Sequence, residues 1–191
     1  MLALLAAGQS SRFGEADKIA ALLGERMLGL HAAKTAAAMP FAGKLVIGSP
    51  DHPCAAQWNA LGYRIIANED AGQGQASSVR LAAAHAAESG ASALCILLAD
   101  MPFVTREHLD RLIAVFETSG GTVASASNGQ VMPPAIFPAR KLDSLLALDG
   151  DSGARTLLVE ARLVAGDDQL LMDVDTVDDL ARANGLYREI R

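Results

Sequence analysis

Short apolar runs alternate along the first two thirds of the chain with longer segments in which apolar residues recur every three or four positions. The apolar runs predict strands at Leu2–Ala6, Lys44–Gly48, Tyr63–Ala67 and Leu94–Ala99. Each run is apolar at nearly every position rather than at every second one. This pattern is typical of parallel strands that are covered by helices on both faces.

The segments between these runs predict helices at Met27–Met39, at Pro53–Leu61, at Gln75–Glu88 and after Thr105. The last is the clearest, because Thr105 can cap it and apolar residues follow at helical spacing from Leu109 to Phe116. Strands that alternate with helices predict βαβ units with right-handed crossovers. The expected fold class is therefore α/β, a three-layer α/β/α architecture around a mostly parallel sheet.

After about Gly120 the rhythm becomes less regular. Short strands are expected in GTVASAS, PPAIFP, ARLVA and LLMDVD, and helices near residues 139–148, within GDSGARTLLVEA and from Thr176 onward. The chain contains no linker, repeat or low-complexity block. We interpret the change as an insertion into one sheet, so residues 1–191 are expected to form a single domain.

The composition of the chain argues against several classes of function. Only 4% of the 191 residues are aromatic, and the formal net charge is −6 with a pI near 5.1, which argues against binding nucleic acid. The two cysteines, Cys54 and Cys95, form no CxxC pair, and the four histidines are scattered singly. No apolar run reaches the length of a membrane span, and no leader precedes the first strand, so a cytoplasmic location is expected.

The first predicted strand leads into a polar loop within LLAAGQSSRFGEADK. Gly8 and Gly14 permit close approach of the backbone, so that amide groups can point at phosphate oxygens. Arg12 and Lys18 add the positive charge that a triphosphate requires. The spacing is neither that of a Walker A loop nor G-x-G-x-x-G. An ordinary turn with solvated charges is the alternative, but Ser10, Arg12 and Lys18 together favour a phosphate site.

A second loop, NEDAGQGQASSVR, precedes the predicted helix at Gln75. Gly72 and Gly74 form a flexible turn, and Ser77 and Ser78 lie in the first turn of the helix. Amide groups at a helix N-terminus and two hydroxyls can contact an anion or a ribose. The alternative is that the serines cap or pack, and the sequence alone leaves both interpretations open.

Asp100 directly follows the apolar strand of CILLADMPFV. A carboxylate at the carboxyl end of such a strand faces the crevice where open α/β sheets bind ligands, and it can hold a metal there. The alternative is a cap for the next helix, but Thr105 fits that position better. We therefore favour a metal ligand.

Two more aspartates lie in LLMDVDTVDDLARA. If this segment is a strand, Asp173 and Asp175 point to one face, where two carboxylates suit a divalent cation. Thr176 and Asp179 match a capping box, which explains Asp179 without a functional role. Further back, GDSGAR offers a small-residue loop in which Arg155 could reach a phosphate, or else a surface turn with Arg155 in solvent.

These motifs resemble those of the molybdenum cofactor nucleotidyltransferases, the MobA-like NTP transferases, whose first segment reads roughly L-A-[AG]-G-x-S-x-R-[FM]-G-x-x-K. The resemblance implies a Rossmann-like fold of the nucleotidyltransferase (glycosyltransferase-A-like) type, Mg²⁺ as cofactor, and transfer of NMP from an NTP to the terminal phosphate of molybdopterin. It implies nucleotide contacts from Leu5, Ala6, Ala7, Gly8, Ser10, Arg12, Gly14, Lys18, Asn68, Gly74, Ser77 and Ser78. The implied catalytic residues are Arg12, Lys18 and Asp100, and the implied metal ligands are Asp100 and Asp175, with Asp173 the weaker candidate. The acceptor-side residues implied by P-P-x-x-F and G-D-x-G-A-R are Pro134, Asp151, Gly153 and Arg155.

Two details of the resemblance concern specificity. The string L-A-A-G, with Ala7, is similar to the cytidylyl-transferring branch, so CTP is favoured over GTP, and a molybdoenzyme or its chaperone is an expected partner. The spacing between Gly8 and Lys18 is one residue longer than usual, so we expect a bulge in the loop. Three alternatives remain: guanylyl transfer to the same cofactor, nucleotidyl transfer to another phosphorylated small molecule, and a non-catalytic nucleotide-binding carrier of the cofactor.

Overall fold

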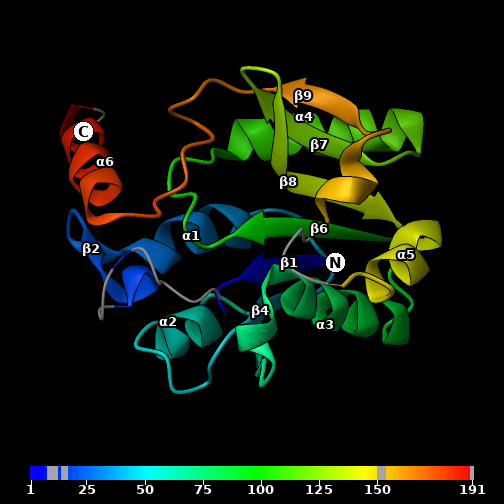
Figure 1. Cartoon of the computed structure of the whole chain (residues 1–191), viewed down its shortest axis with the longest axis horizontal. Helices are drawn as coiled ribbons and strands as arrows, with labels where there is room; N and C mark the ends of the chain where they lie inside the picture. Colours follow the sequence, from blue (N-terminus) through cyan, green and yellow to red (C-terminus); the bar gives the residue numbers. More distant parts are fainter. Residues whose placement is uncertain (8–12, 14–16, 150–153, 190–191) are drawn as a thin grey trace.

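A seven-stranded sheet forms the centre of the molecule in a computed structural model that describes residues 1–7, 13, 17–149 and 154–189 (Figure 1). The strand order is β5-β4-β1-β6-β8-β7-β9. The strands are β1 (Leu2–Leu5), β4 (Lys44–Ile47), β5 (Arg64–Ile66), β6 (Ala93–Leu98), β7 (Val123–Ser127), β8 (Gln130–Pro138) and β9 (Arg162–Ala165). A separate two-stranded hairpin is formed by β2 (Leu22–Leu23) and β3 (Arg26–Met27).

The first four strands of the sheet are parallel, as their apolar sequences predict. The register pairs Leu4 of β1 with Val46 of β4 on one side and with Leu97 of β6 on the other. Beyond β6 the direction changes, because β8 runs antiparallel to both β6 and β7, whereas β9 is parallel to β7. The irregular segment after Gly120 thus adds three strands to one edge of the same sheet.

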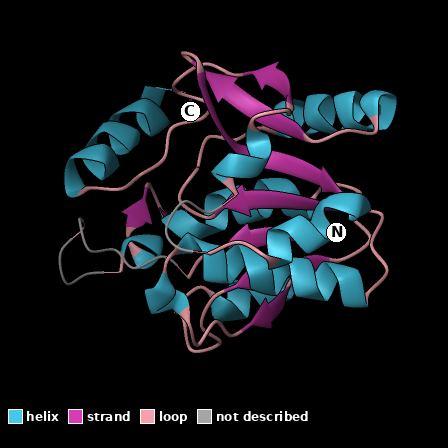
Figure 2. Cartoon of the chain, turned by 45° about the vertical axis from the view of Figure 1, so that its right-hand side comes forward, coloured by secondary structure: helices cyan, strands magenta, loops and turns pink. Residues whose placement is uncertain are grey.

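Helices cover both faces of this sheet, which confirms the expected α/β class (Figure 2). Their bounds are α1 (His31–Ala37), α2 (Ala55–Ala60), α3 (Gln75–Glu88), α4 (Arg106–Ser119), α5 (Leu142–Leu146) and α6 (Val177–Glu189). Single 3₁₀ turns are η1 (Lys18–Ala20), η2 (Leu28–Leu30), η3 (Ala71–Gln73), η4 (Ala139–Lys141) and η5 (Arg155–Leu158). None of the helices in the described ranges is both long and apolar enough to cross a bilayer.

Alternate residues of each central strand enter different cores. Leu2 and Leu4 of β1 pack in the cluster that includes residues of α1, α2 and α4. Ala3 and Leu5 pack in a second cluster, with residues of α3 and α5. Trp58 of α2 is fully buried in the first cluster, as expected for a lone aromatic residue.

Helix α4 is the element that local signals predict best. The Thr105 hydroxyl accepts a hydrogen bond from the amide of His108, which confirms the predicted cap. The helix ends at Gly120, whose φ of 60° suits the left-handed C-terminal position. Helix α3 occupies the predicted range, and its buried alanines allow close approach to the sheet.

Two of the secondary-structure predictions made from the sequence are wrong. Residues 27–39 are not one helix: they contain β3, η2 and a helix that begins only at His31, because Gly24 turns the chain into a hairpin with a φ of 61°. Residues 170–175 do not form a strand. This segment crosses the end of β6, where the amide of Val174 donates to the carbonyl of Asp100, instead of pairing within the sheet.

A third apolar cluster joins the hairpin to the C-terminal part of the chain, as Figure 1 shows at the left. Leu23 and Leu28 pack there with Met172, Val174 and Ala183. The cluster brings the segment before α6 over the sheet edge and toward η1. The fold therefore uses an apolar contact to set the position of residues 173–175.

A buried polar chain connects α4 to β7 and β8. His108 is fully buried, its Nε2 lies 2.8 Å from Oγ of Ser125, and its Nδ1 lies 3.1 Å from Nη2 of Arg111. The Ser125 hydroxyl donates to the carbonyl of Pro134 at 2.9 Å. Because Arg111 can only donate, Nδ1 accepts, and the neutral ring carries its proton on Nε2. Burial, and then the charge of Arg111, lower the pKa of His108 to about 4.

We expect this histidine to make the protein sensitive to acid. In the unfolded chain His108 is protonated with its ordinary pKa of 6.5, whereas in the folded chain its pKa is about 4. The contribution of neutral His108 to the free energy of unfolding is complete above pH 6.5. It is lost as the pH falls toward 4, by at most about 1.4 kcal/mol per pH unit. Urea unfolding of the wild type and of His108→Gln at pH 7 and pH 4.5 measures it. The wild type should lose roughly 2 kcal/mol more than the variant over this interval, and equal losses would contradict the assignment.

Candidate active site

A cavity of about 630 Å³ opens at the carboxyl ends of β1 and β6. This is the edge at which open α/β sheets bind ligands, and the volume lies in the range of small-molecule sites. The walls come from the ends of β1 and β6, from η1, from η3 and the start of α3, from the first half of β8, from the region of η5 and from the segment before α6. Three charged side chains that the sequence singled out, Lys18, Asp100 and Asp175, line it together.

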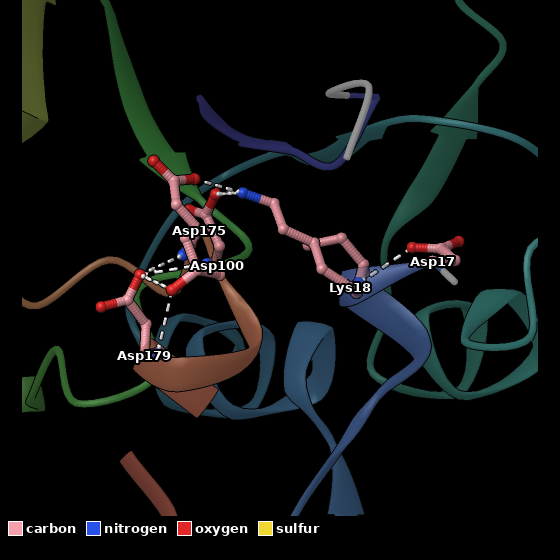
Figure 3. A network of polar contacts seen from close by, with 7 residues as sticks. Asp17, Lys18, Asp100, Asp175 and Asp179 are labelled. Atoms are coloured by element: carbon pink, nitrogen blue, oxygen red, sulfur yellow. Dashed lines mark hydrogen bonds and ion pairs between the residues drawn. The ribbon is translucent and has the colours of Figure 1, made fainter. Parts of the chain in front are cut away.

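Lys18 lies between the two aspartates (Figure 3). Its Nζ is 2.6 Å from Oδ2 of Asp100 and 2.7 Å from Oδ1 of Asp175. The lysine side chain is 9% exposed, against 16% for Asp100 and 41% for Asp175. Burial alone disfavours the ammonium charge, but the two carboxylates outweigh it and raise the pKa of Lys18. The lysine is therefore a fixed cation at neutral pH.

Backbone contacts hold the two carboxylates at the same place. Asp100 follows the last residues of β6, where the amide of Ala99 donates to the carbonyl of Leu5. The carbonyl of Asp100 then accepts from Val174, which brings the neighbouring Asp175 to the end of β6. The strand-end position predicted for Asp100 is thus also the anchor of the second carboxylate.

The predicted capping box fixes Asp175 from the other side. Oδ2 of Asp179 accepts from the amides of Asp175 and Thr176 at 3.3 and 3.0 Å, and the amide of Asp179 donates to the Thr176 hydroxyl (Figure 3). These bonds lower the pKa of Asp179, the Thr176 hydroxyl contributing most. Asp179 is consequently structural, as its position in the box predicts.

Asp173 also lines the cavity, although the segment that carries it is not a strand. Burial raises the pKa of Asp173, and the charges of Asp175 and Asp100 raise it further. Alternation along a strand is therefore not what brings Asp173 and Asp175 to one cavity. The irregular path between the Val174 contact and the capping box does so.

The carboxylates suit a divalent cation whose other ligands come from a substrate. Oδ1 of Asp100 is buried and has no hydrogen-bond partner among the described residues. An acceptor oxygen of this kind is available to a cation that shares the site with Lys18. The described part of the chain holds no set of three or more acidic, histidine or cysteine side chains arranged for a metal. A divalent cation held by these carboxylates would take its other ligands from phosphates and water.

The second predicted segment forms a hydrogen-bonded unit at the start of α3. The Asn68 amide donates to the hydroxyls of Ser77 and Ser78 at 3.0 and 2.9 Å, and Ser77 donates to the carbonyl of Gly74. Ser77 and Ser78 are equally buried, and only Ser78 lines the cavity, together with Gly74. Gly74 has a φ of 88°, which turns the chain into the helix. Asn68 does not line the cavity itself, but its hydrogen bonds orient the two serine hydroxyls.

The remaining predicted residues differ in where the structure places them. Leu5, Ala6 and Ala7 line the cavity at the end of β1. The residues that lie outside the described part of the chain are Gly8, Ser10, Arg12, Gly14, Asp151 and Gly153, and with them the expected bulge before Lys18. Arg155 begins η5, but its side chain is not among those described.

Pro134 is buried in β8 behind the cavity wall, and its neighbour Pro133 forms the wall itself. Gln130 and Met132, which no sequence motif predicts as site residues, lie on the same strand. Both line the main cavity and an adjoining one of about 500 Å³. No motif marks them, because only the pairing of β8 with β6 brings them to the site.

Comparison with known proteins agrees with this geometry. The MobA-like NTP transferase domain matches residues 2–165. The chain belongs to this family. Nucleotidyl transfer is therefore the class of reaction to which the chain is assigned.

Two curated relatives cover nearly the whole of this MobA-like NTP transferase. The purine catabolism protein PucB of Bacillus subtilis is 32% identical over 190 residues, 92% of this chain and 91% of the relative. A molybdenum cofactor guanylyltransferase of Cereibacter sphaeroides is 31% identical over 193 residues, 97% and 96% of the two chains.

Solved structures share the fold. The homologue of Mycobacterium tuberculosis Rv0371c from Mycobacterium sp. strain JC1 superposes with a TM-score of 0.82 at 25% identity, covering 100% of this chain and 97% of the other. Rv0371c of M. tuberculosis itself, in a complex with manganese, has a TM-score of 0.77 at 23% identity, covering 96% and 97%. The expected nucleotidyltransferase fold is confirmed.

Loss of the Lys18 ammonium should destabilise this MobA-like NTP transferase. In Lys18→Met the carboxylates of Asp100 and Asp175 keep their negative charges without the cation between them, which should cost about 2–3 kcal/mol at pH 7. Lys18→Met combined with Asp100→Asn removes part of the repulsion and should regain some of this loss. Urea unfolding at pH 7 compares the two variants. Equal stability of Lys18→Met and the wild type would refute the ion-pair arrangement.

Proposed function

We propose that this chain transfers a nucleotidyl group, CMP from CTP in preference, to the terminal phosphate of a molybdopterin-type acceptor and releases pyrophosphate. The observation that carries the proposal is the position of Lys18 between Asp100 and Asp175 in the cavity at the sheet edge. One fixed cation beside two carboxylates suits a metal-bound triphosphate. The family membership and the guanylyltransferase relative support the same class of chemistry.

Asp100 and Asp175 are the proposed holders of Mg²⁺. The unpartnered Oδ1 of Asp100 supports this, and the manganese complex of Rv0371c concerns a protein of the same fold. A divalent cation bound there would neutralise charge on the phosphate oxygens during transfer. Lys18, which the carboxylates keep protonated, would donate to phosphate oxygens once the nucleotide displaces it from one of them.

The chemistry needs positioning more than a covalent nucleophile. An oxygen of the acceptor phosphate attacks the α-phosphorus in line, the bond from that phosphorus to the bridging oxygen breaks, and pyrophosphate leaves. Lys18, and Arg12 if it reaches the cavity, stabilise the charge that grows on the leaving group. At the start of α3, Gly74 and Ser78 offer backbone and hydroxyl contacts to the nucleotide.

The preference for CTP rests on Ala7. Its methyl group lines the cavity at the end of β1, where the L-A-G-G branch of the family has a glycine. A methyl group at this place would crowd a purine more than a pyrimidine. The relative named a guanylyltransferase makes GTP the competing nucleotide, so the test must include both.

The acceptor is proposed to lie toward β8 and η5. Pro133 and Ala154 line the main cavity on that side, and Gln130, Met132 and Asp173 border both it and the adjoining cavity of about 500 Å³. The adjoining space can take the part of the acceptor that lies beyond its phosphate. In the sequence, Asp151 and Gly153 come shortly before Ala154, and Arg155 is the first residue of η5, which supports the proposed role of these residues in binding the acceptor.

Pyrophosphate release measured with each of the four NTPs, with and without molybdopterin, tests this proposal. Release with CTP that requires molybdopterin is the expected result. Release with GTP alone would overturn the nucleotide preference, and release with another phosphorylated acceptor would overturn the acceptor. Nucleotide binding without any release would favour the non-catalytic carrier.

Asp100→Asn should lower turnover by roughly 100-fold or more, because it removes a charged metal ligand at the reacting phosphate. The fold should persist, since the backbone contact to Val174 and the side-chain volume are kept. Asp110→Asn is the matched control: Asp110 lies on α4 and pairs at 3.6 Å with Arg106 in solvent. Steady-state release of pyrophosphate and a thermal melt compare the three proteins. Unchanged turnover in Asp100→Asn would contradict the assignment of Asp100 as a metal ligand.

A further inference from the structure

Behind Lys18, on the side away from the cavity, lies a histidine that no sequence motif marks. The ring of His52 stacks on the buried indole of Trp58, with centroids 4.8 Å apart and planes at 22°. Its Nδ1 accepts a hydrogen bond from the amide of Cys54 at 3.0 Å. The ring is thus oriented by α2 and by its own loop, and in the neutral form it carries its proton on Nε2.

That oriented nitrogen faces the residue before the lysine. Nε2 of His52 lies 2.8 Å from Oδ2 of Asp17, in a close polar contact without the geometry of a regular hydrogen bond, and the histidine side chain is only 7% exposed. The other oxygen of Asp17 accepts from the amide of Ile19 at 2.9 Å and so caps η1, the 3₁₀ turn that begins with Lys18 (Figure 3). The contact with His52, above all, lowers the pKa of Asp17, so this carboxylate is charged at neutral pH.

The turn that carries Lys18 needs such support. Three residues form η1, and a 3₁₀ turn of this length has few hydrogen bonds of its own. On its inner side Ile19 packs against Gly29, where a β-carbon would come within 2.3 Å of the isoleucine methyl. On its N-terminal side the cap is Asp17, which His52 holds. The backbone of the lysine is therefore clamped between a packed isoleucine and a charged cap.

We propose that His52 is a positioning residue that acts through Asp17 on Lys18, and that it keeps the ammonium group in register with the reacting phosphates. The inference rests on the proposed function. When a triphosphate enters, Nζ of Lys18 must give up a carboxylate and follow the phosphates, while the backbone of η1 stays in place. A loose turn would let the flexible lysine chain miss its target by about 1 Å, an error that can cost up to 100-fold in rate.

Two substitutions separate this role from simple packing. His52→Phe keeps a ring to stack on Trp58 but has no polar nitrogen beside Asp17, whereas His52→Gln keeps a polar group near the position of Nε2. His85→Gln is the matched control, because His85 lies near the far end of α3, beside Glu88. Hydrogen exchange of the Lys18–Ala21 amides, thermal melting and pyrophosphate release are measured for each protein.

We expect His52→Phe to speed exchange of the Ile19 amide and to lower kcat roughly 10- to 100-fold, with His52→Gln recovering part of both. In a Lys18→Ala background, His52→Phe should lower kcat no further, because its effect passes through the lysine. Wild-type exchange and turnover in His52→Phe would overturn the proposal, and so would an equal loss of kcat in both backgrounds. If the wild type releases no pyrophosphate with any NTP, the proposed function fails, and the exchange data alone still decide whether His52 fixes η1.

Discussion

The ammonium group of Lys18 sits between carboxylates contributed by residues 82 and 157 positions further along the chain. Without it, Asp100, Asp173 and Asp175 would place three like charges in one partly buried cavity. Burial, and then the charges of Asp175 and Asp100, raise the pKa of Asp173 even with the lysine present. Three carboxylates around one ammonium group leave an excess of negative charge in the cavity, which a bound divalent cation would reduce.

The remaining parts of the fold deliver these groups to one point. The parallel strands β1 and β6 end side by side, so Ala6, Ala7 and Asp100 meet at the same edge. The apolar cluster of the β2–β3 hairpin and α6 carries the segment of Asp175 across that edge. The binding wall opposite is built by β8, which joins the sheet antiparallel. Packing around the site therefore sets the distances on which its charge balance depends.

Much of this could be predicted from local sequence, and the exceptions have physical causes. The strands, α3, α4 and the Thr176–Asp179 box follow from periodicity and capping, which act between near neighbours. The alternation of apolar and acidic residues predicts a strand at residues 170–175, but no strand within the described ranges pairs with them. The pairing of Asp100 with Lys18 and the stacking of His52 on Trp58 depend on contacts that the spacing of residues in the sequence does not reveal.

The most direct test of the charge exchange at Lys18 is a crystal structure with Mn²⁺ and a non-hydrolysable analogue of the nucleotide that the protein uses. Anomalous scattering locates the cation independently of the protein atoms. The account predicts a peak in contact with Asp100 and Asp175, with Nζ of Lys18 moved onto a phosphate oxygen. A bound nucleotide with its cation held elsewhere, and Lys18 still between the two aspartates, would contradict it.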